Sequence, residues 1–222
     1  MEARTLGQFV SEEGILEGLR TMITDIIARS TKGAKSLGRQ QKLPVVVQCF
    51  KCDATKACCS SVVVARLYEG IVVAAYLKEA SRDTPELREQ LRAAAEAMEG
   101  ASPYDYRKPC VFLDADERCT VYDARPTPCG TLYVYTPPAA CSDPSAAVQA
   151  YVAHAENAVA QQIEDEFRDK LSLRKKVGRR YIGVLPRMVL VALEAWERTD
   201  FRDYLRQLDW PAETDAARWT RR

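Results

Sequence analysis

The sequence predicts a mostly α fold in which helices pack around a cysteine-rich, loop-rich, metal-binding insert. Two observations carry this prediction. Apolar residues recur at helical spacing near the start of the 222-residue chain and again in its last third. Between these parts, residues 101–142 lose helical periodicity, and all eight cysteines lie within residues 49–141. The length suits one domain over residues 1–222, with 49–141 as a metal-binding region flanked by N- and C-terminal helices.

The first predicted element is an amphipathic helix that begins near Glu12, with Ser11 as its N-cap. Its apolar face consists of Ile15, Leu16, Leu19, Met22, Ile23, Ile26 and Ile27. Residues 31–41 are polar and contain two glycines, which predicts a connector. Residues 43–48 are rich in valine, which predicts a short strand leading into Cys49.

A helix is predicted between Cys59 and Leu77, and the next one begins at Thr84-Pro85. Threonine is a good N-cap and proline fits the first helical position, while Gly100 is well placed to end this helix.

Residues 101–142 hold six of the eleven prolines and four of the eight cysteines, so this stretch is predicted to be irregular. By the same capping logic, Asp143-Pro144 is predicted to begin a long helix. Further helices are predicted over residues 187–198 and 201–210.

Charge and hydropathy exclude several classes of protein. The net charge is +1, with 32 basic and 31 acidic residues, so no global field favours nucleic acid or a membrane. No apolar run approaches the roughly 20 residues of a membrane span, and the first residues do not resemble a signal peptide. We therefore expect a cytoplasmic protein. Lasting disulfides are rare in that compartment, so eight cysteines point to a metal.

The first cysteine group combines a Cys-x-x-Cys pair, Cys49 and Cys52, with the adjacent pair Cys58 and Cys59. Two intervening residues let both sulfurs of Cys-x-x-Cys reach one ion at about 2.3 Å. The same spacing also serves thiol redox chemistry. Adjacent side chains point in different directions, so one of the adjacent pair is free to serve a second metal or to bridge two.

The second group, Cys110, Cys119, Cys129 and Cys141, is too widely spaced for one knuckle and suits ligands delivered by successive loops. Proline at positions 126 and 128 stiffens the approach to Cys129. A stiffened loop loses less entropy when a metal fixes it.

The combined pattern resembles a known family. Its parts are Cys-x-x-Cys, Cys-Cys, Cys110-Val-Phe-Leu and Cys119-Thr-Val-Tyr-Asp-Ala-Arg-Pro-Thr-Pro-Cys129. These are similar to YkgJ-type cysteine-cluster proteins, which are described as zinc- or iron-chelating domains and often called Fe–S oxidoreductases. The resemblance implies metal ligation by Cys49, Cys52, Cys58, Cys59, Cys110, Cys119 and Cys129, with Cys141 as an eighth candidate.

Two features of this chain depart from the family pattern. Five residues separate Cys52 from Cys58, more than is usual in the family. Gly130 follows Cys129 where the family commonly has arginine. The first departure bears on the ligand set, and the second on any role for a cation at that position.

Cysteine-only ligation suits both zinc and iron–sulfur clusters. Eight sulfurs are enough for two four-cysteine sites, or for one cluster with four thiols left over. The first hypothesis is an iron–sulfur protein, with [4Fe-4S] as the expected cofactor and a redox or enzymatic role. An enzyme of this kind is expected to be an oxidoreductase or, by a likeness to flagellin lysine methylases confined to the cysteines, a methyltransferase. The alternatives are a non-enzymatic zinc module that binds a partner, and a metal-handling or maturation protein.

Arg125 and Tyr122 are the candidate cofactor-binding residues outside the cysteines. Arg125 is predicted to position the second loop by bonding carbonyls or thiolates, or else to bind an anionic substrate. Tyr104 and Tyr106 are candidate cleft residues. We expect a small-molecule or protein substrate, and no membrane or nucleic-acid partner.

Overall fold

The computed structural model describes residues 4–43, 57–101, 106–143, 145–151, 154–173 and 181–210. Helices dominate these residues, so the predicted mostly α class with an irregular cysteine-rich insert is confirmed. The helices and strands are α1 (Leu6–Glu12), α2 (Ile15–Gln40), η2 (Ala57–Ser60), β1 (Val64–Arg66), α3 (Leu67–Glu79), α4 (Pro85–Glu99), η3 (Tyr122–Ala124), α5 (Thr127–Gly130), η4 (Pro138–Ser142), α6 (His154–Lys170), β2 (Ile182–Val184), α7 (Leu185–Trp196) and α8 (Phe201–Gln207).

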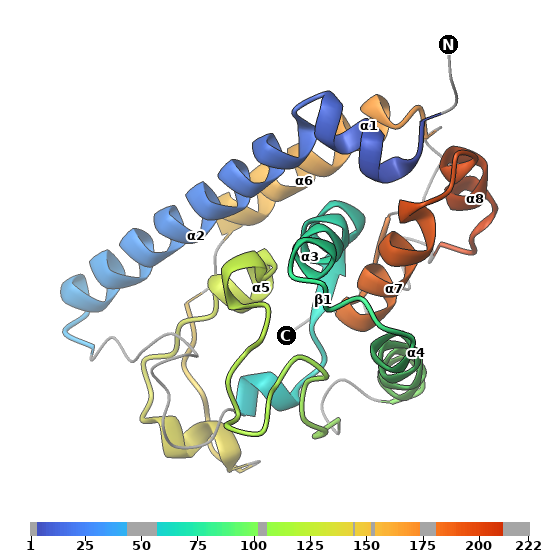
Figure 1. The fold of residues 1–222 in the computed structure, drawn as a ribbon. Coiled ribbons are helices and arrows are strands. Elements are labelled where there is room, and N and C mark those ends of the chain that lie inside the picture. The colour runs from blue at the N-terminus through green and yellow to red at the C-terminus, as the bar shows by residue number, and fades with distance from the viewer. Residues whose placement is uncertain are drawn as a thin grey trace.

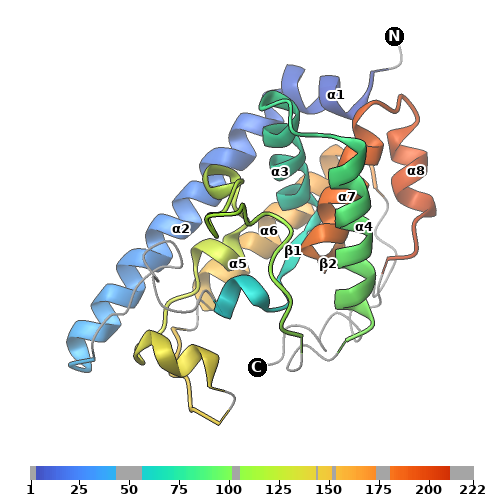
Figure 2. The ribbon, with the colours of Figure 1, turned by 60° about the horizontal axis from the view of Figure 1, so that its bottom comes forward.

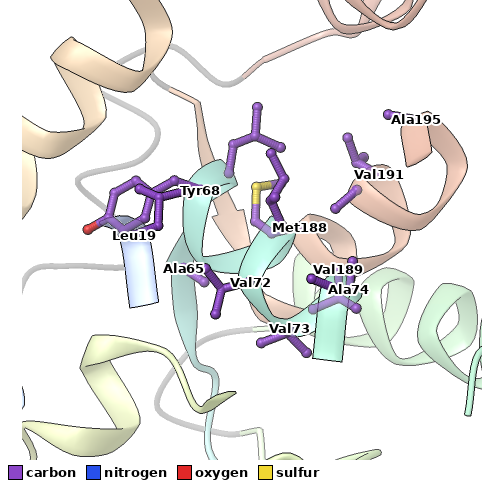
Figure 3. Close-up of a cluster of buried hydrophobic side chains, with 14 of the residues drawn as sticks. Leu19, Ala65, Tyr68, Val72, Val73, Ala74, Met188, Val189, Val191 and Ala195 are labelled. Carbon is purple, nitrogen blue, oxygen red and sulfur yellow. The ribbon is translucent and has the colours of Figure 1, made fainter. Parts of the chain in front are cut away.

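Helix α3 lies at the centre of the molecule. It contacts α7 most extensively and also touches α2 and α6, and in Figure 1 these helices surround it. Its sequence is almost wholly apolar, so nearly every side chain from Leu67 to Leu77 is buried. Figure 3 shows Val72 of α3 and Met188 of α7 in this core.

A short antiparallel ladder precedes both central helices. Strand β1 pairs with β2, with Ala65 opposite Gly183, and each strand runs directly into its helix. The N–H of Leu67 donates to the carbonyl of Tyr181, and that of Leu185 to Val63, at 2.8 and 2.7 Å. These bonds satisfy the first N–H of α3 and of α7, which have no partner inside their own helices.

The start of the chain forms two helices where the sequence predicted one. Thr5 and Gln8 form a capping box that begins α1. Ser11, the predicted N-cap, lies inside α1, so that prediction is wrong. Gly14 has a left-handed φ of 65° and begins α2. Such a backbone conformation costs little for glycine, which explains why the chain turns there.

Helix α2 continues through residues 31–40, so the predicted connector is also wrong. Aromatic residues from the insert pack on this half of the helix. The hydroxyl of Tyr135 donates to the Ala34 carbonyl at 2.9 Å, and Tyr151 lies directly against Gly33. Gly33, one of the two glycines on which the connector prediction rested, therefore allows the close approach of Tyr151 inside a continuous helix.

Helix α4 begins and ends as predicted, with Thr84 as N-cap, Pro85 in the first turn and Gly100 at the C-cap. The predicted helix between Cys59 and Leu77 holds only from Leu67, because η2 and β1 precede it. The predicted helices over 187–198 and 201–210 correspond to α7 and α8. The predicted strand over 43–48 lies almost wholly outside the described residues.

The long helix predicted from Asp143-Pro144 begins only at His154. Before it, the chain pairs with the segment that follows Cys129. The N–H of Tyr135 donates to the Gln149 carbonyl and that of Tyr151 to Tyr133, at 2.7 and 2.8 Å. These backbone N–H and carbonyl groups pair with the neighbouring segment and are not available to a helix. The helix therefore does not begin at Asp143, although the sequence there resembles an N-cap.

The insert between α4 and α6, together with η2, gathers at one end of the helical group (Figures 1 and 2). The cysteines of the described residues lie in this part of the fold. Within the described ranges, every helix is too short or too polar to span a bilayer.

Asp83 joins α3 to α4 and supports a pH-dependent prediction. Its carboxylate accepts bonds from Arg88 at 2.7 and 2.8 Å and pairs with Lys78 at 3.0 Å. Hydrogen bonds from Arg88, followed by those from Lys78, lower the pKa of Asp83 despite burial. A lowered folded-state pKa gives stability that is present above the unfolded pKa and lost as pH falls through the folded one.

Asp83→Asn is therefore expected to lower the free energy of unfolding by about 1 to 2 kcal/mol at pH 7. Its difference from wild type should vanish in strong acid, where wild-type Asp83 is also neutral. Urea unfolding across pH measures this. The exposed Asp116 provides a control, Asp116→Asn, and a difference that persisted unchanged in acid would contradict the electrostatic origin.

Candidate metal centre

Cys110 and Cys119 stand at the two ends of one tight loop. Leu113 and Cys119 form an antiparallel bridge, and the N–H of Thr120 donates to the Phe112 carbonyl at 2.8 Å. The loop tip is exposed, and the Asp114 carboxylate accepts N–H bonds there at 2.8 and 2.9 Å. The loop thus brings together two cysteines that are nine positions apart in the sequence.

Both cysteines of this loop are followed, two residues later, by a core residue. Phe112 and Val121 are each 2% exposed. The backbone N–H of Phe112 lowers the pKa of Cys110, and the N–H of Val121 lowers that of Cys119, although burial outweighs both effects. A pattern of Cys-x-apolar therefore has a physical meaning here: the apolar side chain anchors the backbone, and the backbone N–H supports a thiolate.

The adjacent pair, Cys58 and Cys59, lies on η2 directly before β1. The N–H of Cys110 donates to the carbonyl of Cys59 at 2.7 Å, so the first cysteine group is tied to the second through the backbone. Helix η2 also contacts η4, which carries Cys141. Cysteines from separate parts of the sequence therefore share one end of the fold.

Cys129 lies on α5, a single turn that begins at Thr127. Its N–H donates to the Pro126 carbonyl at 3.0 Å. The next residue, Gly130, packs against Ile27 of α2 so closely that a Cβ would overlap the Ile27 side chain. The arginine common in the family has no room here, which accounts for this departure.

The six described thiols belong to half-buried residues, and burial raises the pKa values of Cys110, Cys119 and Cys129. The pKa of Cys110 rises to about 11, mainly by burial and also by the negative charge of Cys119. Burial raises the pKa of Cys129 well above its usual range, and the charges of Cys110, Cys119, Cys59 and Cys58, in that order, raise it further. The charges that raise the pKa of Cys129 thus come from four other cysteines on three segments of the chain.

The donor set fits a thiophilic metal. The six described cysteines supply sulfur donors, and sulfur ligands select zinc and iron–sulfur clusters over hard cations. A bound cation would displace the thiol protons, and the N–H groups of Phe112 and Val121 would favour the thiolates of Cys110 and Cys119. Among the residues that the structure describes, no three histidine, cysteine, aspartate or glutamate side chains are placed to hold one metal ion. Cys49 and Cys52 lie outside those residues.

Arg125 and Tyr122 are brought together as a stacked pair. The guanidinium of Arg125 lies 4.1 Å from the centre of the Tyr122 ring. Burial raises the pKa of Cys119, while the positive charge of Arg125 lowers it. Both residues also line a groove of about 410 Å³ between α2 and α3, together with Arg20, Thr24 and Tyr76 among others. Tyr106 is buried in a small cluster with Met98, and Tyr104 lies outside the described residues.

Glu69 and Thr127 contribute to the site and were missed by sequence reasoning. Glu69 is fully buried in α3, and its carboxylate accepts the N–H of Thr127 at 2.8 Å and the Thr127 hydroxyl proton. The one feature of the sequence that could have indicated Glu69 is that it is a single carboxylate within an otherwise apolar run, which forms most of α3.

The close contact at Gly130 supports a stability prediction. In Gly130→Ala the new methyl group would lie 2.5 Å from Cγ1 of Ile27, so we expect destabilisation by about 1 to 3 kcal/mol from overpacking. The added substitution Ile27→Val should recover part of the loss. Gly18→Ala, on a turn of α2 with nothing within 4 Å, is the control and should stabilise by about 0.5 to 1 kcal/mol. Thermal melting of the four proteins decides the matter, and a neutral Gly130→Ala would show that α5 can shift.

Comparison with known proteins gives one match. Residues 48–157 match the model of a family named CxxCxxCC and described as "putative zinc- or iron-chelating domain". The match begins just before the first cysteine and extends beyond the last, so it contains all eight. The comparisons with curated proteins and with solved structures gave no match.

Proposed function

Residues 48–157 belong to the CxxCxxCC family, and from this we propose that the chain holds a cysteine-ligated iron centre, an iron–sulfur cluster with a redox role. The family match supports zinc or iron chelation. The choice of an iron–sulfur cluster and of redox function is our proposal.

The observation that carries the proposal is the convergence of Cys59, Cys110, Cys119 and Cys129. A backbone hydrogen bond joins Cys59 to Cys110, and a tight loop joins Cys110 to Cys119. The charges of these three cysteines, followed by that of Cys58, raise the pKa of Cys129. We assign these four residues as the ligands of the first cluster.

Eight cysteines exceed what one zinc ion can bind, so a single structural zinc site would leave four thiols unused. A [4Fe-4S] cluster is held by four cysteine thiolates, which separate segments of the chain can supply. Two zinc ions would also use all eight sulfurs, and metal and sulfide analysis distinguishes the two arrangements.

Cys58 and Cys141 are assigned to a second group of ligands. They lie on η2 and η4, which contact each other. Because Cys58 and Cys59 are adjacent, their side chains suit two sites better than one. Cys49 and Cys52, outside the described residues, complete this second set of four.

The redox role rests on where the thiols lie. All six described cysteines are half-buried, so a cluster that they held would lie within reach of the surface. A cluster held by these residues would supply one-electron transfer, between a one-electron carrier protein as donor and a separate acceptor. Arg125, shared by the groove and the surroundings of Cys119, would help to stabilise the more negative reduced cluster.

Anaerobic purification followed by iron, zinc and acid-labile sulfide analysis tests the proposal. We expect iron and sulfide in equal amounts, a brown protein and bleaching of the visible absorption by dithionite. A colourless protein that holds zinc at four sulfurs per ion would overturn the cluster and establish a structural zinc domain. Iron without sulfide would also overturn the cluster.

A further inference from the structure

Glu69 is a fully buried carboxylate whose two oxygens accept three hydrogen bonds. One oxygen accepts the N–H of Arg66 at 2.7 Å, which caps the first turn of α3. The other accepts both the N–H and the hydroxyl of Thr127. Burying a charged group is costly unless it is paired and hydrogen-bonded, so this carboxylate is held for the bonds that it accepts.

Thr127 is the only residue between Arg125 and Cys129 that has a backbone N–H, because proline occupies positions 126 and 128. The N–H groups at the two ends of this stretch are used locally. That of Arg125 donates to Tyr122, and that of Cys129 to Pro126. The Thr127 N–H is therefore the one backbone donor through which this stretch can bond to the helical core, and it is directed to Glu69.

We propose that Glu69 is the positioning residue for Cys129: its carboxylate fixes the Pro-Thr-Pro-Cys turn on α3 and thereby sets the affinity of the metal centre. That Cys129 is a metal ligand rests on the proposed function. That the turn is fixed rests on the hydrogen bonds alone. Glu69 touches no cysteine in the bonds described and acts through Thr127.

The role requires an acceptor on both oxygens, which only a carboxylate provides. A glutamine at position 69 would turn its NH₂ group toward either the Arg66 N–H or the two Thr127 donors. In either orientation donors face each other and at least one bond is lost. Isosteric replacement should therefore free the turn without creating a cavity.

Alkylation of the full chain, with metal removed, tests the fixed turn independently of metal binding. Iodoacetamide labelling resolved by cysteine in the mass spectrometer gives the rate at Cys129 relative to Cys110. Glu69→Gln should raise this ratio by about 10-fold or more, as expected from loss of a hydrogen bond to a charged group. A general loss of stability would raise both rates and leave the ratio unchanged.

Glu164→Gln is the matched control. Glu164 is 4% exposed and accepts bonds from Arg66 and from the N–H of Tyr181, both at 3.2 Å. The milder Thr127→Val removes only the hydroxyl donor and should raise the ratio less than Glu69→Gln, while Thr127→Ser should behave as wild type.

Titration with Co²⁺, followed by its thiolate charge-transfer absorption, gives the second measurement. Glu69→Gln should weaken Co²⁺ binding about 10- to 100-fold, as outer-shell substitutions do, with Glu164→Gln unchanged. An unchanged labelling ratio in Glu69→Gln overturns the inference whatever the metal result. Wild type that binds no Co²⁺, zinc or iron overturns the proposed function instead, and labelling still decides whether Glu69 fixes the turn.

Discussion

Cys129→Ser is expected to abolish iron loading of the first cluster. The charges of four other cysteines raise the pKa of Cys129, so it lies close to the cysteines from separate segments that we propose as ligands. Removing a direct ligand should weaken metal binding by more than the roughly 100-fold upper range for an outer-shell partner. The serine hydroxyl is a harder donor that suits iron–sulfur ligation poorly. Iron and sulfide per chain, measured after anaerobic reconstitution, give the result.

Cys141→Ser is the control for this experiment. Cys141 lies on η4 and is not among the residues that raise the pKa of Cys129. Its replacement should leave the first cluster loaded and lower total iron only by the share of the second site. If both variants lost all iron, the two groups would form one inseparable centre. Full loading of Cys129→Ser would show that Cys129 is not a ligand.

The helices that local sequence could predict are those with a cap and an apolar face. Helix α4 is the clearest case, since Thr84, Pro85 and Gly100 mark its ends and act as expected. The predicted start of helix α6 was wrong because the segment before it pairs with residues 133–135. No local sequence pattern indicates this contact. The two strands are only three residues each and far apart in the chain, so their pairing could not be predicted from local sequence either.

The sequence predicted which residue types form the candidate site. It did not predict which residues of the helical core hold them in place. Cysteine spacing indicated the metal-binding region, and the structure brings Cys59, Cys110, Cys119 and Cys129 to one end of the fold. The bonds that hold them come from elsewhere. Glu69 lies on α3, and Ile27, which excludes a side chain at position 130, lies on α2. Such support depends on tertiary packing, which a single sequence does not display.

Chelation of the metal is expected to open the insert while the helical core stays protected. Residues 106–143 have only short helical turns, so metal binding should supply part of the free energy that orders them. Helices α3 and α7 are held by an apolar core that needs no metal. Hydrogen exchange before and after chelation should therefore show a large loss of protection in the insert and little change in α3 and α7.

The loss of protection should be uneven within the insert. The loop between Cys110 and Cys119 has an exposed tip, and both of its ends are proposed metal ligands, so its amides should exchange much faster once the metal is gone. The Thr127 amide is bonded to the buried carboxylate of Glu69 and should keep most of its protection. Glu69→Gln should remove that difference, because Thr127 then loses its anchor. Equal protection of the Cys110–Cys119 amides before and after chelation would contradict a metal-supported insert, since burial of Phe112 and Val121 would then hold the loop without help.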